Sequence, residues 1–170
     1  MGIKLNKNQI AITKAADGKD GTRPILQCAC IGKGYIVAAD GFILARHPVE
    51  EFFEETVKIP AKDIQKAGVA KFAGVQFIQT NGTAARLLGK DDINSQVVEG
   101  TYPDYQQLIP TGKATLQVRL GAAVLKKLLA CMGDNDYVGL EFTDGIDAPV
   151  SGAVRWRAGD ADGAFMPAKW

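Results

Sequence analysis

The sequence is poor in histidine and cysteine, the usual ligands of zinc. Its 170 residues include one histidine, His47, and three cysteines, and these do not stand at the spacing of a zinc site. Cys28 and Cys30 lie two apart in an apolar run, where a strand would put both on one face in poor geometry for a mutual disulfide. We therefore expect reduced core cysteines, no metal site and no other cofactor.

Long apolar runs are absent as well. No stretch approaches the ~20 apolar residues of a membrane-spanning helix. We also find no leader in which a charged segment is followed by an apolar one. An apolar fraction of 46% and a charged fraction of 23% are typical of an ordinary globular protein. We expect a cytoplasmic protein with one substantial core or two small units.

The motifs of common enzymes are also missing. The sequence contains neither Gly-x-Ser-x-Gly nor a glycine-rich loop of the usual phosphate-binding pattern. The acidic pairs Glu50-Glu51 and Asp91-Asp92 fall in predicted loops or strand ends, where solvated charge is the ordinary role of a carboxylate. We expect no enzymatic activity.

A hairpin signal, by contrast, occurs three times. Asp40-Gly41, Asn81-Gly82 and Asp144-Gly145 each follow an apolar run, and such dipeptides suit tight primed turns. Each hairpin is preceded by a predicted strand and helix and accompanied by a further strand. The first strands are 2–6, 56–60 and 114–119, the helices 7–18, 61–68 and 120–133, and the further strands 45–52, 95–100 and 163–168. The pattern predicts an α+β fold of three strand-helix-strand-strand units of about 55 residues each.

The segment EGTYPDYQQLIP, residues 99–110, separates the second unit from the third. Pro103 removes a backbone donor and favours extended geometry at Tyr102, while Pro110 discourages a regular element from running on. One interpretation is a surface turn with two half-buried tyrosines. The other is a rigid strap at a domain boundary, with a two-unit domain at 1–110 and a single unit at 111–170.

Positive charge is concentrated in the helical segments. Segments 4–23, 62–71 and 113–127 hold twelve Lys or Arg and three Asp, giving +9, while the remaining chain carries −8. A basic helix face without stacking aromatics or base-reading side chains suits duplex phosphates without sequence readout, although such lysines can also be merely solvated. The predicted DNA contacts are Lys7, Lys14, Lys19, Lys62, Lys66, Lys71, Lys126 and Lys127.

Four phrases in chain order resemble the bacterial sliding clamp, the beta subunit of DNA polymerase III. They are TRPIL at 22–26, AADGFILA at 38–45, EGTYPDYQQLIP at 99–110 and GAFMPAKW at 163–170. The resemblance implies the DNA-clamp fold, a ring whose helices line a hole around duplex DNA and whose sheets form the outer wall. It also implies a processivity factor that tethers a polymerase to DNA, and it places Arg23 where the family has a DNA-contacting arginine. An arginine before a proline could equally be structural.

The resemblance further implies a shallow apolar pocket for short peptide motifs of polymerases and other clamp partners. Carried over position by position, its residues are Leu26, Gly41, Phe42, Leu44, Pro110 and Met166, with Ala164 and Pro167 adjacent. Phe42-Ile43 replaces the His-Arg of the family, and 168–170 differs from the family's closing Met-Arg-Leu. The pocket is thus expected to take a different peptide or none.

Family members have six such units in each chain, whereas this chain has three. We expect the third unit to pair with the same unit of another chain, so that two chains equal one ordinary subunit and four close a ring. An alternative function is a clamp-like regulator or decoy, which would bind clamp-partner peptides without encircling DNA.

Overall fold

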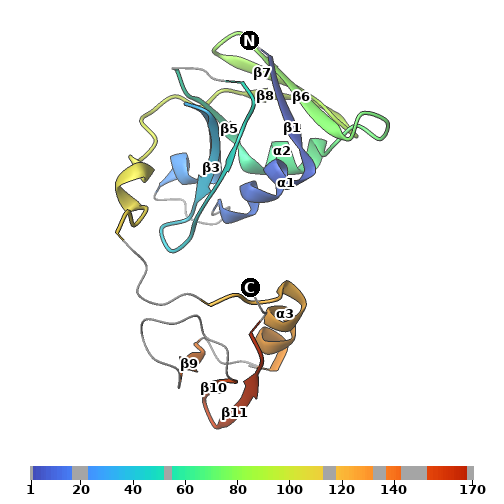
Figure 1. Cartoon of the computed structure of the whole chain (residues 1–170). Coiled ribbons are helices and arrows are strands. Elements are labelled where there is room, and N and C mark those ends of the chain that lie inside the picture. Colours follow the sequence, from blue (N-terminus) through green and yellow to red (C-terminus); the bar gives the residue numbers. More distant parts are fainter. Residues whose placement is uncertain are drawn as a thin grey trace. The chain divides into compact units, whose positions relative to one another are not determined.

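The protein is described from a computed structural model, which gives residues 2–16, 23–51, 55–112, 118–131, 137–142 and 153–167 (Figure 1). The chain divides into two compact units, Met1–Ile109 (unit 1) and Pro110–Trp170 (unit 2). Each unit is considered by itself below.

Unit 1 contains two copies of one order of elements: a strand, a helix and three strands. Repeat 1 consists of β1 (Gly2–Asn6), α1 (Lys7–Ile12), η1 (Thr13–Ala15), η2 (Pro24–Gln27), β2 (Cys28–Gly32), β3 (Tyr35–Ala39) and β4 (Leu44–Pro48). Repeat 2 consists of β5 (Val57–Pro60), α2 (Ala61–Ala67), β6 (Val75–Thr80), β7 (Ala84–Leu88) and β8 (Asp92–Gln96), and η3 (Tyr105–Leu108) follows it.

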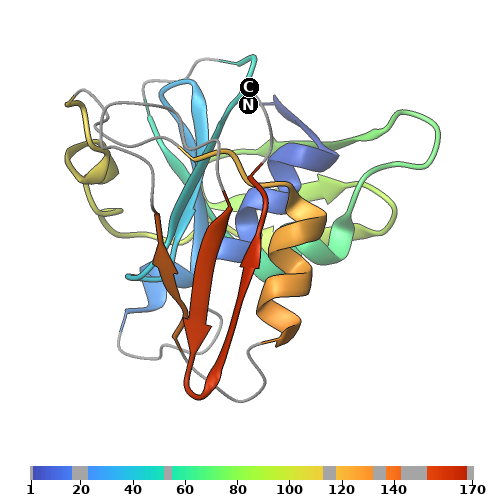
Figure 2. The ribbon, with the colours of Figure 1, turned by 60° about the horizontal axis from the view of Figure 1, so that its bottom comes forward.

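The two repeats exchange their first strands. One sheet has the order β1-β6-β7-β8, so β1 extends the strands of repeat 2, with Gly2 opposite Gln79. The other has the order β4-β3-β2-β5, so β5 extends repeat 1, with Cys28 opposite Pro60. The helices α1 and α2 lie side by side against the sheets (Figures 1 and 2). Each sheet therefore needs both repeats.

Local chemistry explains where β1 ends and α1 begins. Ile3 and Leu5 alternate with exposed residues along β1, as expected for a strand with one buried face. Asn6 then caps α1: its side chain accepts from the N–H groups of Asn8 and Gln9, and the Gln9 side chain accepts from the Asn6 N–H at 2.7 Å. These reciprocal hydrogen bonds form the capping box that Asn6 and Gln9, three residues apart, suggest in the sequence.

The predicted alignment of the repeats was wrong by one hairpin. Asp40-Gly41 lies in the second turn after its helix, between β3 and β4, whereas Asn81-Gly82 lies in the first, between β6 and β7. The prediction missed β2, because its five residues are all buried and show no alternation. The first turn of repeat 1 is Lys33-Gly34, where φ is +52° and +79°, the positive values at both central positions that a type I′ hairpin requires.

The Asp-Gly and Asn-Gly turns share one geometry. In each turn the acidic or amide residue, Asp40 or Asn81, is the first of the four residues. Glycine follows as the first central residue, with φ of +97° at both Gly41 and Gly82. The Asp40 N–H donates to the Ile43 carbonyl, and the Asn81 N–H donates to the Ala84 carbonyl, both at 3.2 Å. The Ile43 and Ala84 N–H groups in turn donate to the side chains of Asp40 and Asn81.

Other element boundaries differ by a few residues. The helix predicted over 7–18 is α1 followed by the short η1, and 17–18 lie outside the described residues. The further strands predicted at 45–52, 95–100 and 163–168 correspond to β4, β8 and β11, each of which begins earlier and ends earlier.

The main core of unit 1 lies between the sheets and α2. Ile64 and Ala67 of α2 pack with side chains from both repeats, which include Ile3, Leu5, Ile31, Ile36, Ile59, Ile78 and Leu87. The buried Gln76 side chain donates to the carbonyls of Ile64 and Gly68 and so satisfies the last turn of α2. Folding removes the apolar surface of these side chains from water, and this transfer is the main force that stabilises the unit.

Unit 2 is a single repeat with a thin core. It consists of α3 (Ala122–Cys131), β9 (Gly139–Glu141), β10 (Val154–Ala158) and β11 (Ala161–Phe165), with sheet order β11-β10-β9 and α3 beside the sheet (Figure 2). The only buried hydrophobic side chains described in unit 2 are Leu128, Val154 and Ala158. Trp156 covers its cross-strand neighbour Gly163, whose missing side chain leaves room for the indole. The predicted turn at Asp144-Gly145 and most of the strand at 114–119 lie outside the described residues.

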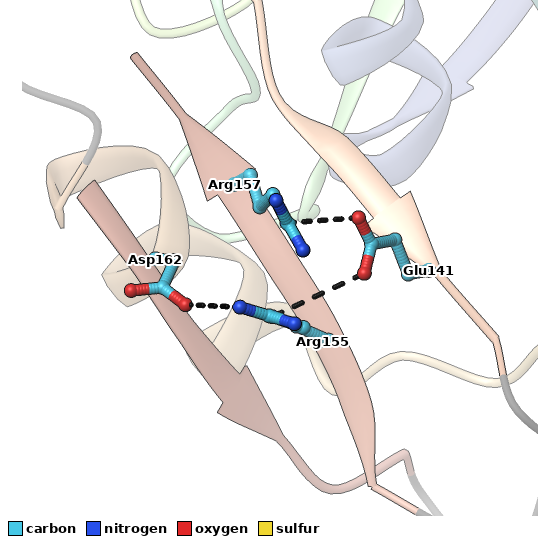
Figure 3. A network of polar contacts seen from close by, with 4 residues as sticks. All are labelled: Glu141, Arg155, Arg157 and Asp162. Atoms are coloured by element: carbon cyan, nitrogen blue, oxygen red, sulfur yellow. Dashed lines mark hydrogen bonds and ion pairs between the residues drawn. The ribbon is translucent and has the colours of Figure 1, made fainter. Parts of the chain in front are cut away.

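The outer face of this sheet carries a row of ion pairs (Figure 3). Arg155 Nη2 lies 2.8 Å from an Asp162 oxygen, and Arg157 Nε lies 2.9 Å from Glu141. Glu141 also approaches Arg155 at 3.9 Å and thereby links all three strands. The charged residues alternate with Val154 and Ala158 on the inner face, so the polarity of β10 follows its pleat.

Candidate nucleic-acid interface and peptide site

The predicted DNA contacts that the structure describes are all exposed. They are Lys7, Lys14, Arg23, Lys62, Lys66, Lys71, Lys126 and Lys127. Lys19 lies outside the described residues. The first repeat contributes its lysines from α1 and η1, the second from α2 and the loop that follows it, and unit 2 from α3. No strand carries any of them.

The structure brings two of these lysines, Lys14 and Lys62, to one cavity of about 300 Å³. Gln27 and Gln65 also line it, so η1, η2 and α2 all contribute polar groups. Gln65 Nε2 donates to the Thr13 carbonyl at 3.1 Å and ties α2 to η1. Two cations at a small polar cavity form an arrangement that favours a phosphate group.

Sequence reasoning missed an aromatic side chain beside Lys71. Phe72 is almost fully exposed in the loop between α2 and β6, and the Lys71 ammonium lies 6.0 Å from the centre of its ring. The only signal for Phe72 in the sequence was an apolar residue in a predicted loop. Helix and strand periodicity does not predict whether such a residue is exposed. One aromatic residue does not make a stacking platform for single strands.

Four predicted pocket residues belong to unit 1. Leu26 is buried in a cluster with Cys30, Val37, Tyr102 and Tyr105, and Leu44 packs against that cluster. Gly41 and Phe42 lie in the turn that leads into β4, and Phe42 is 99% exposed. The structure therefore joins Leu26 and Leu44 through one core cluster and leaves Phe42 on the surface.

The other four belong to unit 2. Pro110 is its first residue, and Ala164, Met166 and Pro167 lie at and just beyond the end of β11. Met166 is 62% exposed and Pro167 is partly buried. The predicted pocket thus draws its residues from both units, and its assembly remains a prediction.

The strap is fixed to unit 1. Tyr102 and Tyr105 are both buried, and burial raises the pKa of each phenol. The Lys58 ammonium donates to the Gly100 carbonyl at 3.0 Å, and Asp104 caps η3 through the Gln106 N–H. A cavity of about 690 Å³ lies between the strap and the start of β5. The interpretation of half-buried tyrosines in a surface turn does not fit this packing.

The cysteines are free thiols in two environments. Cys28 and Cys30 are buried, and Cys131 at the end of α3 is exposed. Burial raises the pKa of Cys28 to about 11 and raises that of Cys30 as well. Within the described ranges, no group of three or more His, Cys, Asp or Glu side chains could hold a metal ion. The helices described there are also too short and too polar to cross a membrane.

The strand exchange, the paired helices and the two sheets of unit 1 have the arrangement of the DNA-clamp fold. Among solved structures, the architecture matches the bacterial sliding clamp, the beta subunit of DNA polymerase III. The beta subunit from Streptococcus pyogenes has a TM-score of 0.72 at 16% identity, over 99% of this chain and 50% of that one. The beta chain from Streptococcus pneumoniae has a TM-score of 0.71 at 17% identity, over 99% and 50%. A sliding clamp from Pseudomonas aeruginosa bound to griselimycin has a TM-score of 0.66 at 15% identity, over 98% and 50%.

These matches confirm the predicted α+β DNA-clamp fold and the resemblance to sliding clamps. The chain spans about half the length of the clamps it matches. At these identities the likeness concerns the fold. No protein-family model and no curated protein matches the sequence.

Proposed function

We propose that this chain is a sliding-clamp-like processivity factor for DNA replication. In this proposal it encircles duplex DNA as a homo-oligomer and tethers a polymerase or another clamp-binding protein through a peptide pocket. The observation that carries the proposal is the combination of the clamp fold with exposed lysines on its helical elements. The protein would act in the cytoplasm, would need no cofactor and would catalyse no reaction.

The domain organisation follows from the same proposal. We infer that 1–110 is a clamp domain of two repeats and that 111–170 is a single clamp-like repeat. Support comes from the strand exchange, which joins the first two repeats through two sheets and one core. The third repeat has three described strands and one helix.

The electrostatic part of the proposal can be tested at the cavity of Lys14 and Lys62. The slope of log affinity against log salt is negative for duplex binding, and each lost phosphate contact reduces its magnitude by about 0.9. The double substitution Lys14→Ala with Lys62→Ala is therefore expected to reduce the magnitude of the slope by roughly 2. Lys126→Glu with Lys127→Glu should weaken duplex association and flatten its salt dependence as well.

Lys4→Ala is the matched control. Lys4 is exposed on β1, on the opposite face of the strand from Ile3 and Leu5, which pack towards α2. Its loss should leave the slope unchanged. Duplex binding that is insensitive to all the helix substitutions, together with intact peptide binding, would favour the regulator or decoy over the processivity factor.

The peptide pocket is a separate part of the proposal. The solved Pseudomonas aeruginosa clamp holds griselimycin, so this compound is a suitable first ligand for the present chain. A labelled hexapeptide with leucine and phenylalanine anchors is the second, because the predicted lining is mostly apolar. Phe42→Ala or Met166→Ala should weaken binding by ~1 to 3 kcal/mol, the range for losing a buried apolar contact at a small interface.

The homo-oligomer is supported by the apolar side chains of α3. Val124, Leu125 and Leu129 are exposed on this helix, whereas Ile64 and Ala67 of α2 are buried in the core shared by two repeats. We infer that a second copy of unit 2 covers α3 through a twofold contact. Light scattering across a concentration series should give a dimer or tetramer, and Leu129→Lys should shift it to the mass of one chain. A single-chain mass for the unsubstituted protein at micromolar concentration would contradict the homo-oligomer.

A further inference from the structure

The turn formed by residues 40–43 presents two exposed apolar side chains, and its backbone is fixed by hydrogen bonds. The Asp40 carboxylate accepts from the N–H groups of Phe42 and Ile43, both at 2.8 Å. The Asp40 N–H donates to the Ile43 carbonyl, and Gly41 adopts a φ of +97°. Phe42 is almost fully exposed and Ile43 is more than half exposed. The turn therefore presents apolar surface where the proposed peptide pocket has its rim.

Unit 1 contains a second turn of the same construction, which serves as an internal reference. Asn81 accepts from the N–H groups of Thr83 and Ala84 at 3.1 and 2.9 Å, and Gly82 has the same φ as Gly41. A side chain built on Gly82 would meet open space. The two turns therefore differ in what covers the glycine.

The guanidinium of Arg23 covers Gly41. From the position of a Cβ atom on Gly41, Arg23 Nη2 lies at 3.1 Å, Nη1 at 3.2 Å and Cζ at 3.5 Å. Both terminal nitrogens are closer than Cζ, so the edge of the guanidinium that carries Nη1 and Nη2 faces the glycine. Hydrogen bonds from the Ile43 and Phe42 N–H groups lower the pKa of Asp40, and the charge of Arg23 lowers it further. Arg23 thus contacts the turn by shape and by charge.

The backbone of Arg23 is itself fixed to the core. Arg23 is the N-cap of η2, with Pro24 in the first turn, and its carbonyl accepts from the Leu26 N–H at 3.0 Å. Leu26 is buried in a core cluster. Leu44, the residue directly after the 40–43 turn, packs against the same cluster. Arg23 therefore connects two segments, η2 and the 40–43 turn, whose residues both belong to the proposed pocket.

We propose that Arg23 is a positioning residue for the 40–43 turn, holding Phe42 and Ile43 in the orientation that receives an apolar peptide anchor. This inference rests on the proposed peptide site. It assigns Arg23 to peptide binding and not to a duplex phosphate, and it commits the peptide to apolar anchors because Phe42 and Ile43 form the surface that Arg23 supports.

Three substitutions separate the parts of this contact. Arg23→Ala removes both the guanidinium that contacts Gly41 and its charge, and Arg23→Lys keeps the charge but replaces the two terminal nitrogens with a single ammonium. Asp40→Asn keeps an oxygen that can accept both N–H groups, as Asn81 does in the reference turn, and removes the charge that Arg23 faces. The combination of Arg23→Ala with Asp40→Asn closes a double-mutant cycle.

Hydrogen exchange tests the inference without any ligand. In the full-length chain, Arg23→Ala should raise the exchange rates of the Phe42 and Ile43 amides at least about fivefold. The Thr83 and Ala84 amides of the reference turn should not change, which excludes a general loss of stability. Unchanged rates at Phe42 and Ile43 would overturn the inference whether or not the proposed pocket binds a peptide.

Binding measurements then test the functional consequence with griselimycin and the labelled hexapeptide. We expect Arg23→Ala to weaken binding about five- to twentyfold, Arg23→Lys to rescue it only in part, and the double variant to lose less than the product of its single effects. The salt slope of duplex binding should stay unchanged. A slope reduced in magnitude by about 0.9 together with unchanged peptide affinity would overturn the inference and assign Arg23 to a phosphate.

Failure of the proposed function gives a different result. If the unsubstituted chain binds neither griselimycin nor the hexapeptide, the peptide site is wrong, and the exchange rates still decide whether Arg23 positions the turn. If binding occurs and exchange at Phe42 and Ile43 does not respond to Arg23→Ala, the peptide site stands and the role of Arg23 does not.

Discussion

The two units are built from the same kind of repeat but bury very different amounts of apolar surface. In unit 1 two repeats share two sheets and one core, and many large side chains, among them Ile64 and Leu87, are inaccessible to solvent. In unit 2 one repeat provides a three-stranded sheet and one helix, and much of the apolar face of α3 is exposed. The difference shows that the repeat becomes a well-packed structure when a second repeat supplies a strand and a helix.

The largest expected effect comes from deleting buried volume in the shared core. Ile64 is fully buried between both sheets of unit 1, so Ile64→Ala should destabilise that unit by about 2 to 5 kcal/mol. The matched variant in unit 2 is Leu129→Ala on α3, where the side chain is 52% exposed and the expected change is within ~0.5 kcal/mol for an isolated chain.

Native-state hydrogen exchange can follow the two units separately. Ile64→Ala should lower protection throughout unit 1 and leave unit 2 unchanged. Equal losses in both units would show that the comparison is wrong and that the units unfold together.

A smaller loss is expected from Gly89→Ala, which tests how closely the turn between β7 and β8 approaches the end of α2 within repeat 2. A Cβ on Gly89 would collide with the carbonyl oxygens of Ala67 and Gly68 at the end of α2. The N–H of Lys90 also donates to the Ala67 oxygen at 2.7 Å, so the backbone there has little room to move. Overpacking of this kind costs about 1 to 3 kcal/mol in urea unfolding. Gly112→Ala in unit 2 is the control, since its Cβ would meet open space, and a comparable loss there would contradict the explanation.

The cysteines give a pH-dependent test of the same contrast. Burial raises the pKa of Cys28 from 9.0 to about 11, so the stability linked to its neutral thiol is complete below pH 9 and is lost as pH rises from 9 to about 11. The free energy of unfolding of unit 1 should therefore fall over that window, and less so after Cys28→Ala.

At pH 8 the exposed Cys131 should react first with iodoacetamide. Equal reaction rates at Cys28 and Cys131 in the native protein would contradict the assigned burial.

The smallest effect is expected on the outer face of unit 2. Asp162→Asn removes one ion pair from the row that joins β9, β10 and β11, but the partners are exposed and screened by solvent. The midpoint of thermal unfolding should change little at low salt, and the change should disappear in 1 M NaCl. A large decrease that persists in high salt would mean that the row stabilises unit 2 more than its thin core does.

Much of the fold follows from local patterns in the sequence. The alternation of Ile3 and Leu5 and the capping box at Asn6 predicted β1 and the start of α1 to the residue. The uniformly buried β2 has no such alternation, and Lys33-Gly34 is a less familiar turn dipeptide than Asp-Gly, so the first hairpin of repeat 1 was missed. Exchange of β1 and β5 depends on contacts between distant segments, which a local pattern does not encode.

The candidate sites follow the sequence less closely. Solvent exposure of the lysines was predictable, because charged side chains on amphipathic helices face water. Their meeting at one cavity was not, because Lys14 and Lys62 lie on elements far apart in the chain. The contact of Arg23 with Gly41 likewise depends on how η2 and the 40–43 turn come together in space. The sequence therefore predicts which side chains are charged and exposed, whereas their neighbours in space come from the structure.

The exchange of β1 also affects how the protein is made. Gly2 pairs with Gln79, so β1 has no partner in its sheet until β6 has been synthesised. At the usual ~5 to 20 residues per second, a nascent chain waits roughly 4 to 15 seconds for that partner. During this interval the backbone edge of β1 and the apolar face formed by Ile3 and Leu5 are open to chaperones and to neighbouring nascent chains. The strand that interlocks the finished unit is therefore the segment most in need of protection during synthesis.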